Sequence, residues 1–468
     1  MIIFCISLIT ICILGVTNGL EKPQQIHLSL TKDPTEMAIT WVTFDEGNYN
    51  DGSGTTQKVE FRKAFTSRYT TIRAHTTKFI NSAKITRYVH RATMTGLNPG
   101  ESYVYQVGVP GAYSAEFTFQ QLTQKPPYRI CVFGDLGVFN GELTQSHLVE
   151  EAEKRSFDLI IHVGDIAYDL FSEGGTVGDT YFNKLQPLFA TVPYMVIAGN
   201  HEEEYGQNYT TYKNLFTMPN EGYDDNQFYS FDLGPIHFIG LSSEYYGYYY
   251  QYGMEPVFNQ YTWLENDLKN AVANRAQRPW IIVYHHRPFY CSNDNSDECN
   301  AFENRLVRDG FLNMPGLEKI FMESNIDIAF WGHEHSYERF LPRSPESMQS
   351  SDPYRNPKGP IYIISGAAGC HSGYAYFAKN PVQYSAARYN DYGYSRMIVS
   401  NNTHIHFEQF SVEKEQVIDS VWIVKENGKN IMSTIKNGTT KEDLVICHPK
   451  DMHCHLKNEK DKYDVHID

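Results

Sequence analysis

Five short apolar segments, each followed at once by polar side chains, constrain the fold of this 468-residue chain more than any other feature. The segments cover residues 129–133, 159–163, 194–198, 280–284 and 326–331, and stretches with helical patterning lie between them at 143–156, 178–190, 261–275 and 316–324. Buried strands that alternate with helices are typical of an α/β domain with helices outside and sheets inside. Because functional groups of such domains collect beyond the carboxyl ends of the strands, we expect the five following loops to meet at one place.

These five loops carry the side chains that proteins use to ligate metals. Their sequences are Gly134-Asp135-Leu136-Gly137, Gly164-Asp165-Ile166-Ala167-Tyr168, Gly199-Asn200-His201-Glu202, His285-His286 and Gly332-His333-Glu334-His335. A glycine opens four of them and allows the sharp turn that directs the next side chain inward. Any one loop has an ordinary explanation, such as a helix cap or a core tyrosine, but the ordered set predicts a metal site.

Composition indicates a folded chain and excludes two kinds of partner. Apolar residues make up 41% of the chain and charged residues 20%, as in globular proteins. The 40 Lys and Arg against 55 Asp and Glu leave a net charge of −15, which repels nucleic-acid backbones and anionic membrane surfaces. We therefore expect no nucleic-acid partner, and no membrane association once the N-terminal segment is removed.

The first 19 residues have the pattern of a secretory signal. An apolar run over residues 2–16 is too short to span a bilayer and is followed by Thr17-Asn18-Gly19, although no Lys or Arg precedes it. We predict a signal peptide over residues 1–19 and a secreted or lysosomal location, with an N-terminal anchor as the alternative. Three sequons, at Asn208, Asn401 and Asn437, are candidate glycosylation sites.

Six cysteines remain after the signal, an even number in an exported chain. Cys291 and Cys299, and likewise Cys447 and Cys454, lie close enough in sequence to close small disulfide loops. Cys131 lies in an apolar run, where a buried thiol is the simpler interpretation, and the partner of Cys370 stays open.

Before the α/β pattern begins, residues 20–123 alternate apolar and polar side chains over short stretches and predict an all-β sandwich. The stretch 95–107 resembles the late strands of fibronectin type III-like domains. Lys125-Pro126-Pro127 marks a linker. We expect the catalytic domain over residues 128–395, followed by a C-terminal β segment and a charged tail over residues 396–468.

The set and order of the five loops resemble the purple acid phosphatases over about residues 128–411, and the larger members of that family also carry an N-terminal sandwich. The resemblance implies an α/β (α+β) metallophosphatase sandwich of two mixed sheets flanked by helices. It implies a first metal, Fe(III), held by Asp135, Asp165, Tyr168 and His335, and a second, divalent metal (Fe(II), Zn or Mn) held by Asp165, Asn200, His286 and His333. Asp165 would bridge the two ions.

The chemistry of these donors agrees with that assignment. Carboxylate and phenolate oxygens suit trivalent iron, whereas an amide oxygen and imidazoles suit a divalent ion. Protein Ser/Thr phosphatases have Asp-x-His in the first loop; here Gly137 takes the place of that histidine, so Tyr168 is expected to supply the missing ligand. Of the adjacent histidines we choose His286, which leaves His285 as a core residue or a support of the ligands.

The family resemblance implies a secreted or lysosomal acid phosphatase that hydrolyses phosphate monoesters by metal-hydroxide attack on phosphorus, and it leaves a homo-oligomer open. His201 would donate the proton and bind phosphate, with Glu202 orienting it. Plant-type members carry a His pair about nine residues past the ligand that corresponds to His286; residues 293–298 contain no histidine, so we expect His201 to deliver the proton alone and a Cys291–Cys299 disulfide to fix this loop. The alternatives are another binuclear phosphoesterase, acting on nucleotides or phosphodiesters, and a non-catalytic secreted binding protein.

Overall fold

The N-terminal region folds as two antiparallel sheets. The computed structural model describes residues 21–44, 56–81, 83–219, 225–294 and 299–426, so the predicted signal peptide, Asn437, Cys447 and Cys454 lie outside the described residues. The first strands are β1 (Gln24–Ser29), β2 (Met37–Thr43), β3 (Lys58–Lys63), β4 (Thr70–Arg73), β5 (His75–Ile80), β6 (Thr86–Met94), β7 (Ser102–Val109), β8 (Ala112–Tyr113) and β9 (Phe117–Gln120). One sheet has the order β1-β2-β6-β5 and the other β4-β3-β7-β8, with β9 also paired to β7. The predicted sandwich is therefore correct, and β7 alternates as expected, with Tyr103, Tyr105 and Val107 buried.

Two larger mixed sheets follow, as the resemblance implied. The first contains β10 (Tyr128–Phe133), β12 (Leu159–His162), β14 (Tyr194–Val196), β24 (Gly393–Val399), β25 (His404–Ser411) and β26 (Gln416–Val424), in the order β14-β12-β10-β24-β25-β26. The second contains β15 (Tyr229–Leu233), β16 (Ile236–Gly240), β17 (Trp280–Tyr284), β20 (Ile328–Trp331), β21 (Tyr337–Phe340), β22 (Ile361–Ser365) and β23 (Ser385–Tyr389), in the order β15-β16-β17-β20-β22-β21-β23. Short pairs join β11 (Leu136–Gly137) to β13 (Ile166–Ala167) and β18 (Gly310–Phe311) to β19 (Met314–Pro315).

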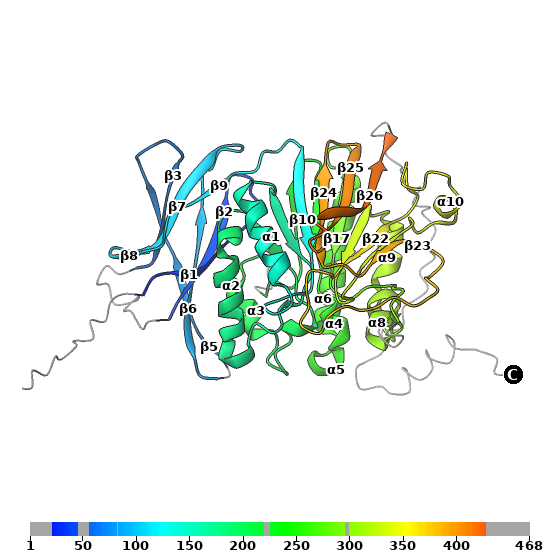
Figure 1. Cartoon of the computed structure of the whole chain (residues 1–468), viewed down its shortest axis with the longest axis horizontal. Helices are drawn as coiled ribbons and strands as arrows, with labels where there is room; N and C mark the ends of the chain where they lie inside the picture. The colour runs from blue at the N-terminus through cyan, green and yellow to red at the C-terminus, as the bar shows by residue number, and fades with distance from the viewer. Residues whose placement is uncertain (1–20, 45–55, 82, 220–224, 295–298, 427–468) are drawn as a thin grey trace, which may run out of the picture.

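Each of the five apolar segments contains a strand of these sheets. In the first sheet β10, β12 and β14 are parallel, and in the second β16, β17, β20 and β22 are parallel. The strand β24 pairs antiparallel with β10, so the last strands among the described residues extend the sheet that the first apolar segment begins. This arrangement brings the carboxyl ends of parallel strands from both sheets to one side of the molecule (Figure 1).

Helices cover the sheets. They are α1 (Glu142–Glu153), α2 (Thr176–Phe189), α3 (Thr210–Leu215), α4 (Glu244–Gly247), α5 (Tyr249–Tyr252), α6 (Glu255–Ala273), α8 (Phe302–Asp309), α9 (Leu317–Glu323) and α10 (Pro345–Met348), with 3-10 turns η1 (Ser172–Gly175) and η2 (Asn200–Glu202). The four predicted helices correspond to α1, α2, α6 and α9. Within the described part of the chain, no helix combines the length and apolar character needed to cross a membrane.

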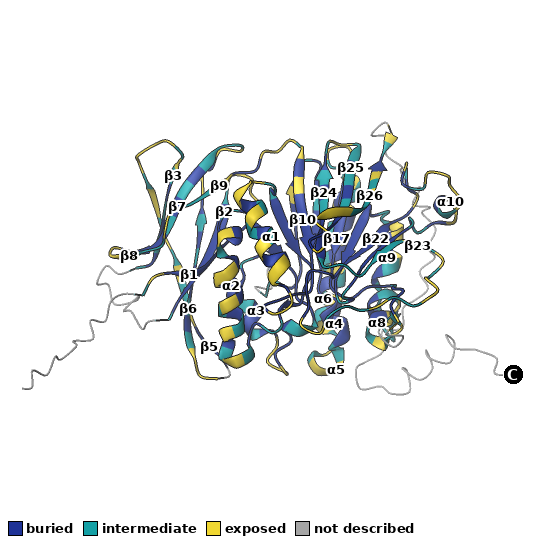
Figure 2. Ribbon diagram, viewed as in Figure 1, coloured by how far each residue is buried: buried dark blue, intermediate teal, exposed yellow. Residues whose placement is uncertain are grey.

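The N-terminal sandwich packs directly against the rest of the molecule. Strand β1 lies along α2 (Figure 1), and the Tyr105 hydroxyl donates to the Ala190 carbonyl at 2.7 Å. The Arg87 guanidinium pairs with Asp179 of α2 at 2.6 Å. One continuous apolar cluster includes Trp41 in the sandwich and Ile161 in the first sheet. Figure 2 shows that the strands of both regions are largely buried. The two regions therefore share a core.

Candidate metal centre

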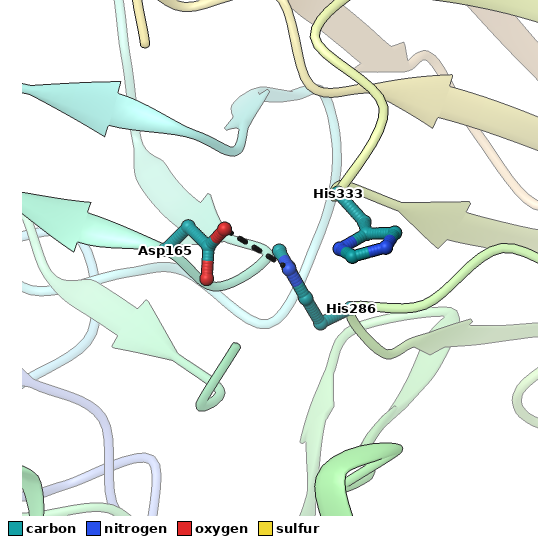
Figure 3. A group of neighbouring side chains, drawn as sticks. All are labelled: Asp165, His286 and His333. Atoms are coloured by element: carbon teal, nitrogen blue, oxygen red, sulfur yellow. Dashed lines mark ion pairs between the residues drawn. The ribbon is translucent and has the colours of Figure 1, made fainter. Parts of the chain in front are cut away.

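The loops that follow five strands bring the predicted ligands together. Asp135 follows β10, Asp165 follows β12, and Asn200 begins η2 after β14. His286 follows β17 of the second sheet, and His333 follows β20. Figure 3 shows Asp165, His286 and His333 directed towards one another from both sheets.

The first group of potential ligands surrounds the Asn200 amide oxygen. One ligand atom each of Asp165, His286 and His333 lies within 4.8 Å of the others. The His286 Nε2 atom is 3.3 Å from Asp165 Oδ2, and the Asn200 Oδ1 atom is 3.0 Å from His286 Nε2 and 2.8 Å from His333 Nδ1. The other ring nitrogen of His286 lies 2.9 Å from the Val163 carbonyl, which holds the ring so that Nε2 faces the group.

The second group shares Asp165 with the first. Ligand atoms of Asp135, Asp165 and His335 lie within 4.8 Å of one another. The Tyr168 hydroxyl donates to Asp135 Oδ1 at 3.1 Å and lies 3.1 Å from His335 Nε2. All seven predicted ligand residues are therefore gathered in two adjoining groups with Asp165 between them.

The buried carboxylates of this cluster favour the binding of cations. Asp135 and Asp165 are both buried, at 0% and 1% exposure. Burial and repulsion by Asp165 raise the pKa of Asp135 well above its usual range, despite the opposing effect of His286. Burial also acts to raise the pKa of Asp165, but His286 and His201 outweigh it and hold that pKa well below the usual range. Two buried carboxylates at close range are costly without positive charge between them, and the hard oxygen donors match a metal ion.

The backbone at the centre is strained. Asp135, Asp165, Tyr168 and His333 all lie in the left-handed region, with φ between 52° and 70°. This conformation is uncommon for residues other than glycine and costs about 1–3 kcal/mol each, and such residues cluster at active sites. The surrounding fold thus holds these side chains in orientations that an unconstrained chain would avoid.

The motif glycines act mainly by leaving space. Gly164 has the left-handed φ of 91°, but Gly199 has a φ of −103°, which other residues adopt. A Cβ on Gly199 would lie 2.2 Å from Asp165 Oδ1, and one on Gly332 would lie 2.5 Å from Asp135 Oδ2. The sharp turn expected from the sequence therefore explains the glycine at position 164. At Gly199 and Gly332 the reason is the close approach of the Asp165 and Asp135 carboxylates.

His201 lies beside the two groups and is oriented by Asp169, not by Glu202. The His201 Nδ1 atom forms an ion pair with Asp169, and the His201 amide donates to Asp165 Oδ1 at 2.9 Å. Burial lowers the pKa of His201, but the carboxylates of Asp165 and Asp169 outweigh it and raise the pKa to about 9. His201 therefore holds a proton in mildly acidic solution, and its Nε2 atom is not engaged by Asp169.

Glu202 instead holds the loops together. Its buried carboxylate accepts hydrogen bonds from the amides of Asp165 at 2.9 Å, Ile166 at 2.8 Å and Gly199 at 2.7 Å. The loop after β12 and the loop after β14 are thereby fixed to each other.

The structure adds one histidine that sequence reasoning missed. The exposed His371 ring lies 4.9 Å from the Tyr168 ring and 6.0 Å from the His201 ring, measured between centroids, and Tyr168 itself lies 4.4 Å from His201. His371 follows β22 in the stretch Gly369-Cys370-His371-Ser372-Gly373, so the same signal of a strand followed by a glycine-rich loop was present a sixth time.

His285 is a core residue. It is fully buried, and the Trp331 indole donates to its Nε2 at 2.9 Å. Burial lowers the pKa of His285 to about 3. The neutral ring thus packs on the far side of β17 from the ligands.

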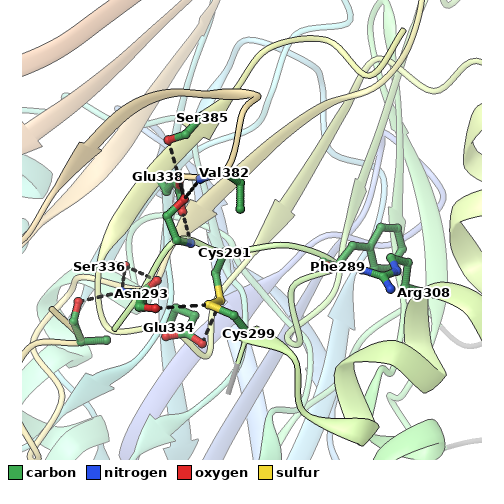
Figure 4. The surroundings of a disulfide bond; sticks show 12 residues. Phe289, Cys291, Asn293, Cys299, Arg308, Glu334, Ser336, Glu338, Val382 and Ser385 are labelled. Atoms are coloured by element: carbon green, nitrogen blue, oxygen red, sulfur yellow. Dashed lines mark hydrogen bonds between the residues drawn. A yellow bond between two sulfur atoms is a disulfide. The ribbon is translucent and has the colours of Figure 1, made fainter. Parts of the chain in front are cut away.

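A disulfide joins Cys291 and Cys299 beside Glu334 (Figure 4). The Cys291 Sγ atom lies 3.3 Å from Glu334 Oε1, so the bridge lies next to the loop that carries His333 and His335. Cys131 and Cys370 are buried free thiols. The side chains of Asn208 and Asn401 are exposed, as glycosylation would require.

With this geometry in hand, comparisons with known proteins define the class. Residues 128–337 match the family described as Calcineurin-like phosphoesterase, residues 23–121 match the purple acid phosphatase N-terminal domain, and residues 359–420 match the iron/zinc purple acid phosphatase-like protein C domain. The sheets and the site are thus those of a metallophosphoesterase.

Relatives narrow this class to one family. Human acid phosphatase type 7 is 38% identical over 90% of this chain and 96% of its own length, and probable purple acid phosphatase 20 of Arabidopsis thaliana is 32% identical over 86% and 87%. In fold, the chain matches the purple acid phosphatase PPD1 from yellow lupin seeds with a TM-score of 0.73 and 24% identity, covering 87% of this chain and 75% of that one. The chain belongs to the purple acid phosphatases, a family of binuclear metal enzymes that act on phosphate esters, and it is an acid phosphatase.

Proposed function

We propose that this acid phosphatase hydrolyses phosphate monoesters at a binuclear Fe(III)–M(II) centre built on Asp165. The observation that supports the proposal is that Asp165 belongs to both groups of potential ligands, so one carboxylate would lie between two bound ions. Fe(III) would be held by Asp135, Asp165, Tyr168 and His335, and a divalent Fe, Zn or Mn by Asp165, Asn200, His286 and His333.

The two ions and the protein side chains would supply different parts of the hydrolysis. When bound, the two ions supply the Lewis acidity that polarises the phosphate and makes water nucleophilic in mildly acidic solution. His201 donates from Nε2 to the oxygen of the leaving group while Asp169 stabilises its charge. His371, whose ring lies 6.0 Å from the His201 ring and contacts the same tyrosine, would supply a second N–H group to the phosphate.

The proposal also includes export of the enzyme from the cytosol. The apolar segment over residues 2–16, the exposed sequons at Asn208 and Asn401, and the Cys291–Cys299 disulfide together support a secreted or lysosomal enzyme. Intact mass of the protein purified from a eukaryotic host, before and after glycosidase treatment, tests the signal cleavage after Gly19 and the glycans. Retention of residues 1–19 in the mature protein would favour the anchor instead.

Metal analysis combined with turnover tests the centre itself. We expect two metal ions per chain and hydrolysis of phosphate monoesters in preference to diesters. Asn200→Ala should keep iron, lose most of the divalent ion and lose at least about tenfold in activity, because it removes one ligand of one group only. Asn266→Ala, exposed on α6, is the matched control. A preference for diesters or nucleotides would favour the alternative of another phosphoesterase. Two bound metals without turnover would favour a binding protein.

A further inference from the structure

A cleft of about 470 Å³ opens directly beside the metal centre, and the mechanism above leaves it unused. Asn200 and His201 line it, so a group attached to a phosphate at the centre would lie next to this cleft. Its walls come from the segment after η2 and from the tyrosine-rich stretch that includes α4 and α5.

The walls of this cleft are aromatic. They include Phe171, Tyr205, Tyr248 and Tyr250. Tyr205 is 83% exposed and Tyr250 69% exposed, so both rings offer large faces to a ligand. Phe171 contacts Tyr205 edge to face at 5.3 Å between centroids, and Tyr248 lies 6.2 Å from Tyr250. Rings in such arrangements favour a further aromatic ring by stacking or edge contacts.

The cleft is built on a fixed frame. The Glu203 carboxylate accepts hydrogen bonds from the Gly206 amide at 2.7 Å, from Gln251 Nε2 at 3.0 Å and from the Tyr252 hydroxyl, which joins the two walls. Arg287, the neighbour of His286, pairs with Glu244 at the start of α4 at 3.0 Å. The backbone segments that carry the tyrosines are therefore joined to each other beside the metal centre, which reduces the entropy lost on binding.

The charges of the cleft restrict its ligand. Asp169 and Glu203 are its carboxylates, and none of the described residues that line it is Lys or Arg. His201 at the metal centre pairs with Asp169, so Glu203 is the carboxylate of the cleft that no lining cation offsets. A second phosphate or carboxylate on the leaving group would be repelled by it.

We propose that this cleft is a leaving-group subsite that selects phosphate monoesters of uncharged or cationic aromatic alcohols. The inference rests on the proposed function, because the centre must hold the phosphate. In the reaction the P–O bond to the aromatic alcohol breaks and its oxygen takes a proton from His201. The oxygen of water bonds to phosphorus, and the proton that this water loses restores His201 through the solvent.

A matched ligand pair tests the subsite apart from leaving-group reactivity. Benzyl and cyclohexylmethyl compounds are similar in size and both release an alkyl alcohol, but only one has an aromatic ring. We expect the metal-loaded wild type to bind benzylphosphonate about 3- to 10-fold more tightly than cyclohexylmethylphosphonate by calorimetry, with the same preference in kcat/KM for the two phosphate esters. Tyr205→Ser and Tyr250→Ser should each reduce this preference, and the double variant should abolish it.

The controls separate the possible outcomes. Phe65→Ser removes a fully exposed aromatic ring from the N-terminal sandwich and should keep the wild-type preference. Equal affinities in the wild type, or an unchanged preference in the double variant, would overturn the subsite. Unequal phosphonate affinities without hydrolysis of either ester would retain the subsite and overturn the proposed hydrolysis.

Discussion

At the residue scale, Tyr168 connects the parts of the centre. Its hydroxyl contacts Asp135 and His335, and its ring packs against His201 and His371. Burial, with repulsion by Asp135 and Asp165, raises the pKa of Tyr168 well above its usual value. The phenol therefore stays protonated unless a strongly charged cation replaces the proton.

The first prediction concerns the colour of the iron-loaded protein. Oxidised protein with full iron occupancy should show a visible absorption band from charge transfer between the Tyr168 phenolate and Fe(III), and Tyr168→Phe should lose it. Visible spectra recorded together with iron analysis check this. A colourless wild type with iron bound would show that Tyr168 is not a ligand, and Tyr250→Phe, in the neighbouring cleft, should keep the band.

Proton delivery gives a second prediction for single residues. His201→Ala should lower kcat/KM for an alkyl phosphate about 10- to 100-fold more than for an activated aryl phosphate, which leaves readily as an anion. His371→Ala should instead raise the inhibition constant of inorganic phosphate and affect both esters alike, because it removes a phosphate contact. Equal losses on both esters in His201→Ala would reject His201 as the acid.

At the element scale, the loops after β12 and β14 act as one unit through Glu202. Glu202→Ala leaves three amides without their acceptor, and buried unsatisfied donors cost about 1–3 kcal/mol each. We predict a loss of at least about 3 kcal/mol in the free energy of unfolding, measured with urea, and a reduced metal content. Glu150→Ala, exposed on α1, should change neither value; a stable Glu202→Ala variant with full metal content would contradict the prediction.

The strands could be predicted because apolar runs of this length are typical of buried strands. The candidate ligands could be found because the loop that follows each run begins with metal-ligating residue types. His371 was not recognised, since its strand is followed by Gly366 and four further residues before the histidine. Asp169 lies one residue past Tyr168, and only the fold shows that it reaches His201. Likewise, the cleft joins residues 203–206 to residues 248–251, a contact that no local pattern encodes.

At the scale of the whole molecule, the sandwich and the sheets are coupled through buried histidines as well as apolar side chains. His27 of β1 stacks on Phe182 of α2 at 5.2 Å and is 1% exposed. Burial lowers the pKa of His27 from 6.5 to about 4 and outweighs its hydrogen bond to the Gln25 carbonyl. The folded protein therefore keeps this ring neutral where the unfolded chain binds a proton.

The pH dependence of stability follows from that difference. Below about pH 6.5 the unfolded state gains a proton that the folded state does not. The free energy of unfolding therefore decreases as the pH is lowered from about 6.5 to about 4, by at most roughly 3 kcal/mol for His27. His27→Gln should flatten this fall in urea titrations at pH 7, 5.5 and 4. His75→Gln, exposed on β5, should keep the wild-type slope, and parallel curves for all three proteins would contradict the prediction.

The pairing of β10 with β24 has a consequence for biosynthesis. Strand β10 ends at Phe133 and its antiparallel neighbour begins at Gly393, so more than half of the chain is translated between them. Until β24 emerges from the ribosome, one edge of β10 lacks its partner, and an open strand edge invites association with other nascent chains. We therefore expect metal binding at the centre to follow the synthesis of β24, because Asp135 directly follows the unpaired strand.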